Sequence, residues 1–309
     1  MTNRMEQQRI LVTGGAGFIG SNLANSLADS NDVTAVDDCS LGTPENLDQA
    51  VDFREQSVFD DDLPTAVDVV FHLAALSSYA MHEEDQRRGA RVNIEGFVNT
   101  VDQAYDDGCD TVVYASTSSI YGSRTEPSPE EMDVTANTAY EASKLARERY
   151  AEYFSNHFGM SMAGMRLFSV YQGYQGAEGH KGEYANVIAQ FADDIANARQ
   201  PLLYGDGTQT RDFTHVDDVI RGLELVAEAR LDGIYNLGTG ERYSFNTVVE
   251  KLNEILGTNV EPVYVENPIP DGVYVHDTCA DYSKLSRATG WEPEISFREG
   301  LERVSRGYV

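Results

Sequence analysis

Short apolar segments alternate along the chain with longer segments of helical periodicity, and this alternation limits the possible folds more than any other feature. The apolar segments, which are typical of buried strands, are 9–15, 32–38, 67–75, 110–118 and part of 160–171. The helical segments between them are 19–30, 93–108 and 139–159. A repeated strand–helix–strand order predicts a parallel sheet that is covered by helices on both faces.

The pattern changes after Gly173, where a polar, glycine-rich stretch predicts a loop. Three later segments predict helices, namely 184–199, the end of 201–229, and 246–257, and 233–240 is typical of one more strand that returns to the sheet. We therefore expect an α/β fold, a doubly wound Rossmann-type parallel sheet with a smaller, mostly C-terminal α/β lobe. The expected boundaries are 1–171 for the sheet domain, with a return segment at about 209–240, and 172–208 and 241–309 for the lobe.

The chain is strongly acidic, with 23 Lys and Arg against 51 Asp and Glu and a formal net charge of −28. A polyanion repels phosphate backbones and anionic lipid surfaces, so neither nucleic acid nor a membrane is an expected partner. The acidic residues are scattered, which indicates a solvated surface. Few lysines and many carboxylates also resemble proteins that work in high salt, so we hypothesise a halophilic protein.

The N-terminal stretch has no apolar signal segment, and no run of about 18 apolar residues occurs, so we expect no membrane span. The three cysteines, Cys39, Cys109 and Cys279, are widely spaced and form no C-x-x-C motif. This spacing argues against a disulfide framework and against a metal site. We expect a cytoplasmic protein.

The sequence "VTGGAGFIG" places Gly14, Gly17 and Gly20 between the first strand and the first helix. Glycines in this position permit a tight turn and let backbone N–H groups approach a pyrophosphate, which the helix N-terminus also attracts. A glycine triplet alone is weak support, but its place in the first strand–helix unit is the context that dinucleotide binding requires. The alternative is a tight turn that binds nothing.

Asp37 ends the second strand, where a carboxylate can accept hydrogen bonds from both ribose hydroxyls of adenosine. The same charge would repel a 2′-phosphate, so NAD is the predicted cofactor rather than NADP. Asp38 is the neighbour that could share or replace this role.

Tyr140 and Lys144 lie four residues apart in a predicted helix and therefore project from one face. Lowering a tyrosine pKa from about 10 to about 7 requires about 4 kcal/mol. One ammonium roughly 4 Å away supplies on the order of 4 kcal/mol at an effective dielectric constant of about 20. The pair therefore suffices for a general base, although a surface helix contact explains the spacing equally well.

Hydroxyl side chains cluster at the end of the strand 110–118, in the sequence "ASTSSIYG". Ligands of parallel sheets sit at the C-terminal ends of the strands. A hydroxyl at this place can exchange a hydrogen bond with the oxygen that reacts with Tyr140, which favours the functional interpretation of that residue.

The motifs together resemble the extended short-chain dehydrogenase/reductase family, and within it the NAD-dependent nucleotide-sugar epimerases of the UDP-glucose 4-epimerase type. The motifs that carry the resemblance, in order, are "TGGAGFIG", Asp37, "HLAA", "ASTSSIYG", Tyr140-x-x-x-Lys144, "YGDGTQTRDFTHVDD" and "YNLGTG". They cover nearly the whole chain. The resemblance implies an enzyme that epimerises a nucleotide sugar, most simply UDP-glucose and UDP-galactose at C4, through a transient 4-keto intermediate.

The resemblance also implies roles for individual residues. In the implied active site Tyr140 is the base, Thr117 binds the sugar 4-oxygen, and Lys144 binds the nicotinamide ribose. The implied cofactor site consists of Gly14, Gly17, Phe18, Ile19, Gly20, Asp37, Asp38, Ser57, Val58, Leu73, Ala74, Ala75, Asn93, Tyr140 and Lys144. The implied substrate site consists of Ser118, Ser169, Val187, Tyr204, Arg211, His276 and Thr278. Arg211 would contact the substrate diphosphate, or instead form a salt bridge with Asp212 or Asp217.

Two positions distinguish reaction types within the family. Dehydratases carry an Asp-Glu pair after the active-site Thr and decarboxylases carry a Glu, where this chain has Ser118 and Ser119. Neither serine can serve as the acid or base that elimination needs, so epimerisation is favoured. Thr278 stands where 4-epimerases carry the residue that gates the sugar's C2 substituent, and a small side chain there would admit an N-acetyl group.

The chain departs from the family pattern at several substrate positions. Ser169 stands in place of a usual Asn, Ser57 in place of an Asp near the adenine, and Asp271 near an expected diphosphate-binding Arg. His276 could compensate for that Arg, although a lone histidine is more often structural.

Two alternatives to the epimerase remain: another nucleotide-sugar reaction on the same scaffold, such as a reductase or a dehydratase-like enzyme, and a catalytically silent NAD-binding protein. The family also implies a homodimer through the helices near 93–105 and 139–154.

Overall fold

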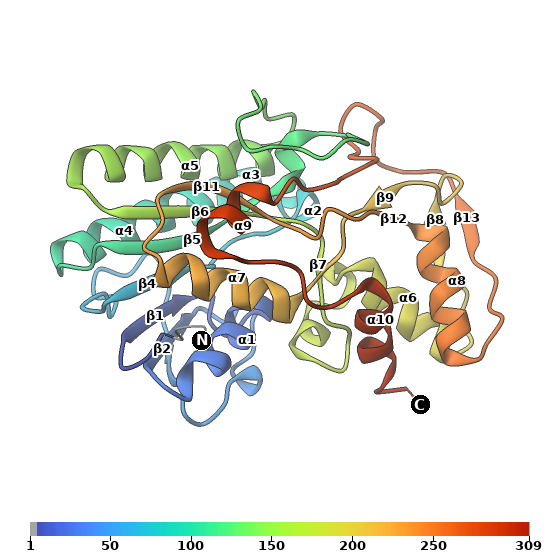
Figure 1. The fold of residues 1–309 in the computed structure, drawn as a ribbon, viewed down its shortest axis with the longest axis horizontal. Coiled ribbons are helices and arrows are strands. Elements are labelled where there is room, and N and C mark those ends of the chain that lie inside the picture. The colour runs from blue at the N-terminus through green and yellow to red at the C-terminus, as the bar shows by residue number, and fades with distance from the viewer. Residues whose placement is uncertain (1–4, 309) are drawn as a thin grey trace.

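A seven-stranded parallel sheet forms the centre of the computed structural model, which describes residues 5–308 (Figure 1). Its strands, in spatial order, are β11 (Gly233–Leu237), β6 (Ser161–Leu167), β5 (Thr111–Thr117), β4 (Val69–His72), β1 (Arg9–Thr13), β2 (Asp32–Asp37) and β3 (Asp52–Glu55). The predicted fold class is confirmed. The expected return strand is also confirmed, since β11 pairs in parallel with β6.

Helices cover both faces of the sheet, because alternate strand residues point to opposite sides. On one face, Ile10 and Val12 pack with α1 (Phe18–Ala28) and α7 (Val216–Glu228). On the other face, Leu11 packs with α4 (Gly96–Asp106) and α5 (Ala139–Phe158). Figure 1 shows the two helix layers on opposite sides of the strands.

The lobe has its own core, which is formed by α6 (Val187–Ala196), α8 (Phe245–Leu256) and α10 (Phe297–Ser305). Three short two-stranded pairs lie outside the main sheet. These pairs are β7 (Val170–Tyr171) with β10 (Thr214–His215), β9 (Thr210–Arg211) with β12 (Tyr243–Ser244), and β8 (Leu202–Tyr204) with β13 (Val263–Val265).

The C-terminal segment crosses back over the sheet domain before it ends in the lobe (Figure 1). Leu285, in α9 (Ser283–Thr289), and Trp291 are fully buried in the same core as α1 and α7. The Trp291 indole also donates to the Asp218 carbonyl at 3.0 Å. The domain boundaries remain a prediction, but this segment packs with the sheet domain rather than with the lobe.

Several elements were not predicted from the sequence. Strand β3 carries mostly exposed residues and thus lacks an apolar run. The short helices α2 (Tyr79–Glu84) and α3 (Gln86–Ala90) and the two-residue strands of the lobe are too short for periodicity to indicate them.

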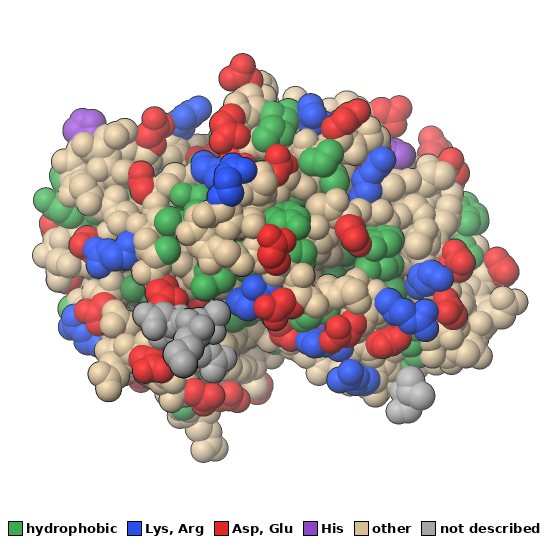
Figure 2. All heavy atoms as spheres, in the orientation of Figure 1, with side chains coloured by type: hydrophobic (Ala, Val, Ile, Leu, Met, Phe, Trp, Pro, Cys, Tyr) green, Lys and Arg blue, Asp and Glu red, His purple; other side chains and the backbone are tan. Residues whose placement is uncertain are grey.

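The acidic surplus is spread over the surface. Figure 2 shows acidic side chains scattered across one face, with Lys and Arg side chains between them. Within residues 5–308, no helix combines the length and apolar character needed to cross a membrane.

Candidate active site

A cavity of about 540 Å³ lies at the C-terminal ends of the sheet strands. It opens beside β1 and β4, where the strand order reverses and the chain leaves the two strands in opposite directions. Such a switch point is the usual ligand site of an open parallel sheet. Segments that follow β1, β2, β4, β5 and β6 all contribute to its lining.

The glycine turn forms one wall of this cavity. Gly14 has a φ of +68°, and a Cβ there would lie 2.6 Å from the Ala74 nitrogen, so only glycine fits. Gly17 caps α1 without a side-chain hydrogen bond, and the first turn of α1 has no acidic residue. The first N–H groups of α1 are therefore available to an anion in the cavity.

Asp37 lies beside this turn and holds it in place. Its carboxylate accepts from the backbone nitrogens of Ala16 at 3.1 Å and Cys39 at 2.9 Å. Burial raises the pKa of Asp37, which these backbone hydrogen bonds oppose. Asp38 also lines the cavity. The glycine turn, the free helix N-terminus and the two carboxylates together fit the pyrophosphate and the adenosine ribose of NAD.

Tyr140 and Lys144 enter the cavity from α5, whose first residue is Ala139. The Lys144 ammonium lies 5.9 Å from the centre of the Tyr140 ring, so the predicted juxtaposition is present. That ammonium also donates to the Ala115 carbonyl at 3.1 Å.

Burial also changes the pKa values of this pair, an effect that the charge of Lys144 alone does not include. Burial raises the pKa of Tyr140 and lowers the pKa of Lys144 well below its usual value. The chain's own surroundings therefore favour the neutral form of both side chains. The Thr117 hydroxyl beside the phenol opposes this rise of the Tyr140 pKa, as does the charge of Arg147.

Arg147 is a residue that sequence reasoning missed. It is fully buried, and burial lowers its pKa to about 10, so it stays charged at neutral pH. Its guanidinium donates to the carbonyls of Asn93 at 3.0 Å, Ala115 at 3.2 Å and Ala74 at 3.1 Å. The available signal was its spacing, seven residues after Tyr140, which places both on one helix face.

The hydroxyl cluster ends β5 as predicted. Thr117, Ser118 and Ser119 all line the cavity. The Thr117 oxygen accepts from the Ser119 backbone nitrogen at 3.2 Å and donates to the Ser119 hydroxyl at 3.1 Å. These bonds fix the hydroxyl of Thr117 next to the phenol of Tyr140.

Asn93 does not line the cavity but supports its wall. It is fully buried, and its amide accepts from the Leu76 nitrogen at 2.9 Å and donates to the Leu76 carbonyl at 3.0 Å. These two hydrogen bonds fix the backbone just after Leu73, Ala74 and Ala75, which do line the cavity. Val58, Phe18 and Ile19 also line it, whereas Ser57 does not.

Arg211 approaches the cavity from the lobe. Its guanidinium lies 5.5 Å from the Phe245 ring centre and 5.6 Å from that of Tyr274. It donates to the carbonyls of Thr210 and His276, both at 2.8 Å. Within residues 5–308 it forms no salt bridge with Asp212 or Asp217, since Asp212 accepts from other backbone groups and Asp217 pairs with Arg303.

Two further predicted substrate residues, Ser169 and Thr278, also line the cavity. Ser169 has a φ of +30°, a strained conformation that Asn adopts more readily than Ser. The structure does not bring Val187, Tyr204 or His276 to the cavity. His276 is exposed, and its ring lies 2.9 Å from the Asp277 carboxylate.

Two lobe segments line the cavity without having been predicted to do so. The members of these segments are His180, Lys181, Tyr184, Ile269, Val273, Tyr274 and Val275. Both segments lack regular periodicity, so no pattern in them indicates where their side chains lie. The scarcity of lysine could have drawn attention to Lys181, because the chain has only four lysines.

Comparisons with known proteins agree with this site. A model of the NAD dependent epimerase/dehydratase family matches residues 10–238. The UDP-glucose 4-epimerase of Mycolicibacterium smegmatis is 31% identical over 310 residues, which cover 96% of this chain and 97% of the relative. A UDP-N-acetyl-alpha-D-glucosaminuronate decarboxylase of Bacillus cytotoxicus is 31% identical over 319 residues, with 96% and 97% covered.

A solved structure gives the same result for the fold. The UDP-glucose 4-epimerase of Thermotoga maritima with UDP-glucose has a TM-score of 0.88 to this chain, at 32% identity, and 97% of this chain and 98% of that one are covered. The chain therefore belongs to the NAD-dependent epimerase/dehydratase family, within the extended short-chain dehydrogenase/reductases, and NAD is its cofactor.

Proposed function

We propose that this enzyme interconverts UDP-sugars that differ in configuration at C4, most simply UDP-glucose and UDP-galactose, through a transient 4-keto sugar. The observation that carries the proposal is the meeting of Thr117, Tyr140 and Lys144 in the cavity that the glycine turn also lines. Relatives with the names of UDP-sugar epimerases support the substrate class.

In this proposal Tyr140 takes the proton of the sugar 4-hydroxyl and later returns it. Thr117, which lines the cavity with Tyr140, would bind that oxygen. Lys144 binds the nicotinamide ribose and, with Arg147, favours the phenolate. NAD, when bound, supplies a hydride acceptor and donor at C4 and a positive ring that also favours the phenolate.

The remaining roles concern binding. The turn from Gly14 to Gly20 would hold the NAD pyrophosphate, and Asp37 the adenosine ribose. Arg211, held between two aromatic rings, would contact the substrate diphosphate. Asp271 is exposed and contributes no positive charge, so Arg211 would carry the diphosphate contact.

The residues after Thr117 favour epimerisation over elimination or decarboxylation. Ser118 and Ser119 occupy the cavity wall where an acid or base would be needed. Glu141 also lines the cavity, but its carboxylate accepts from the Asn137 nitrogen at 2.7 Å at the start of α5. Its position is explained by that helix cap.

The test is a mass-spectrometric and NMR screen of UDP-, GDP- and dTDP-sugars with the purified protein and no added NADH. We expect interconversion of a UDP-sugar pair that differs at C4. Thr278→Tyr should lower turnover of UDP-N-acetylglucosamine far more than turnover of UDP-glucose. Activity that consumes stoichiometric NADH would identify a reductase instead, and release of CO₂ from a UDP-sugar acid would identify a decarboxylase.

A cytoplasmic location is part of the same proposal, supported by three free cysteines.

A further inference from the structure

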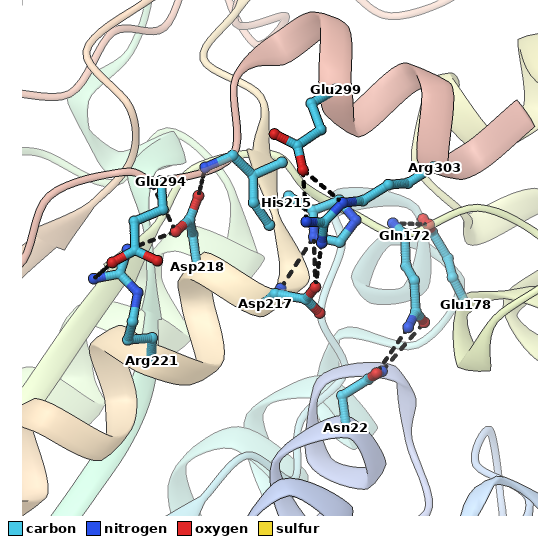
Figure 3. Close-up of polar contacts among 11 residues, drawn as sticks. Asn22, Gln172, Glu178, His215, Asp217, Asp218, Arg221, Glu294, Glu299 and Arg303 are labelled. Atoms are coloured by element: carbon cyan, nitrogen blue, oxygen red, sulfur yellow. Dashed lines mark hydrogen bonds and ion pairs between the residues drawn. The ribbon is translucent and has the colours of Figure 1, made fainter. Parts of the chain in front are cut away.

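A segment of the lobe lies against the first helix of the sheet domain, and we name residues 172–186 the cap loop. At its start, the side chain of Gln172 donates to Asn22 of α1 at 2.7 Å and accepts from it at 3.2 Å (Figure 3). Further along, the His180 ring lies 2.9 Å from the Asn46 amide, which also donates to the Ala16 carbonyl of the glycine turn at 3.2 Å. The cap loop thus bonds α1 directly and reaches the glycine turn through Asn46.

The carboxylate of Glu178 gives the cap loop its shape. Glu178 is fully buried and accepts from the backbone nitrogens of Gly173 at 2.8 Å and Asn186 at 2.6 Å. It also accepts from the backbone nitrogen of Gln172 at 2.8 Å (Figure 3). Three backbone donors from both ends of the loop therefore meet at one side chain. Such charge-assisted bonds stabilise one loop conformation.

This conformation delivers Lys181 to the cavity. Its ammonium lies 5.6 Å from the centre of the Phe18 ring, and Phe18 is the first residue of α1. A cation beside a helix N-terminus meets the positive end of the helix dipole, which is unfavourable unless an anion lies between them. Within residues 5–308, the Lys181 ammonium has no salt-bridge partner and no hydrogen bond.

The other two cations of the cavity differ in this respect. Lys144 donates to the Ala115 carbonyl, and Arg211 donates to two carbonyls. Burial lowers the pKa of Lys181, and the nearby charge of Glu178 opposes this shift. The carboxylate of Glu178 already accepts from three backbone donors. The Lys181 ammonium therefore needs another anion as its direct partner.

We propose that Lys181 is a cofactor-binding residue, whose ammonium contacts the pyrophosphate of NAD opposite the glycine turn. The cap loop would thereby join the lobe to the cofactor and slow its release. The substrate diphosphate is the other pyrophosphate in such a site. The cofactor is favoured because the cap loop bonds α1 through Gln172 and reaches Ala16 of the glycine turn through Asn46, whereas Arg211 lies on β9.

The test compares Lys181→Met with Lys181→Arg and with Lys251→Met. Lys251 lies on α8 and pairs with Glu254 at 2.9 Å, so it is a matched lysine remote from the cavity. The NAD retained by each purified protein after gel filtration is measured, followed by calorimetric dissociation constants for NAD, ADP-ribose, adenosine and UDP. None of these readouts requires turnover.

We expect Lys181→Met to weaken NAD and ADP-ribose binding by roughly tenfold or more, which is the typical effect of one charge-assisted hydrogen bond. Adenosine and UDP binding should be unchanged, and Lys181→Arg should recover most of the affinity. The loss should also be smaller in molar KCl, because salt screens the contact. Unchanged NAD affinity, an equal loss for adenosine, or a loss confined to UDP would each overturn the proposal.

Discussion

The phenol of Tyr140 lies between opposing influences. Burial raises its pKa, while the Thr117 hydroxyl and the charge of Arg147 lower it. The base role therefore depends on positive charge that is brought close to a buried group, where each charge acts through a low dielectric. Arg147 provides such a charge, and the Lys144 ammonium, at 5.9 Å from the ring centre, is placed to add a second one when it is protonated.

Replacing Lys144 with Met should change the pH dependence of turnover. A base acts when deprotonated, so kcat/KM rises with pH through the pKa of Tyr140. Loss of the ammonium raises that pKa, and the rising limb should move upward by about 1 to 2 pH units. The profile is measured on NAD-loaded protein, with Lys251→Met as the control. A limb that does not move would show that Lys144 leaves the phenol unaffected.

At this scale the sequence predicted reactive groups better than their surroundings. Spacing alone placed Tyr140 and Lys144 on one helix face, and both line the cavity. Spacing cannot report burial, and burial sets the direction of both pKa shifts. His276 was predicted to line the substrate site but does not line the cavity. It lies in an irregular segment, where no periodicity indicates the direction of a side chain.

Helix α5 carries the reactive pair, and its N-terminus sets the position of Tyr140. Thr138 caps the helix by accepting from the Glu141 nitrogen at 3.1 Å, and Glu141 accepts from Asn137 in return. This arrangement resembles a capping box. Tyr140 is the second residue of the helix, so fraying of the first turn would displace the phenol.

Thr138→Ala should therefore affect both stability and activity. Loss of an N-cap typically costs about 1 kcal/mol of the free energy of unfolding. Ser296→Ala is the matched control, because Ser296 caps α10 of the lobe by accepting from Glu299 at 3.3 Å. We expect a similar loss of stability for both variants by urea unfolding, but a lower kcat only for Thr138→Ala. Equal kcat values would contradict a positioning role for the cap.

Elements with a continuous apolar pattern were predictable, and those without one were not. The strands β4 and β5 are buried along their whole length, and β1 is buried at every residue except Arg9. Their burial produces apolar runs in the sequence. Strand β3 lies at the sheet edge and is polar, so nothing in its composition indicates a strand. The cap loop is held by one buried carboxylate and by bonds to α1, which are tertiary contacts that local patterns do not reveal.

The whole molecule exposes an aromatic patch on the helix layer of α4 and α5. Its members are Tyr105, Tyr150, Tyr153 and Phe158, with exposed fractions of 42%, 43%, 45% and 37%. Tyr153 and Phe158 pack edge to face, and Tyr105 lies beside Phe158 at 4.7 Å between ring centres. A clustered exposed aromatic surface is typical of a protein–protein interface. We propose that two copies of the chain associate through this patch and form a homodimer.

Tyr153→Glu should convert the dimer into a monomer, because it places a charge in the centre of an apolar contact. Light scattering coupled to gel filtration measures the mass, which is 34.1 kDa for one chain. Tyr264→Glu is the control, since Tyr264 is also exposed but lies on β13 of the lobe. A monomeric wild type, or a dimeric Tyr153→Glu variant, would contradict this interface.

The net charge of −28 predicts a dependence of stability on salt. Like charges repel in the compact state, and salt screens that repulsion. We expect the melting temperature to rise between about 0.1 M and molar KCl. A melting temperature that is flat or falls over this range would contradict salt adaptation.

The central claim is that the C4 hydrogen leaves the sugar and returns to the same carbon within one bound complex. The most direct measurement follows UDP-glucose labelled with deuterium at C4, using NMR and mass spectrometry, with purified protein and no added NADH. We expect UDP-galactose that retains the deuterium at C4, no accumulation of NADH, and no conversion by Tyr140→Phe, which should still bind NAD. Loss of the label from the product, net formation of NADH, or turnover by Tyr140→Phe above about a tenth of the wild-type rate would contradict it.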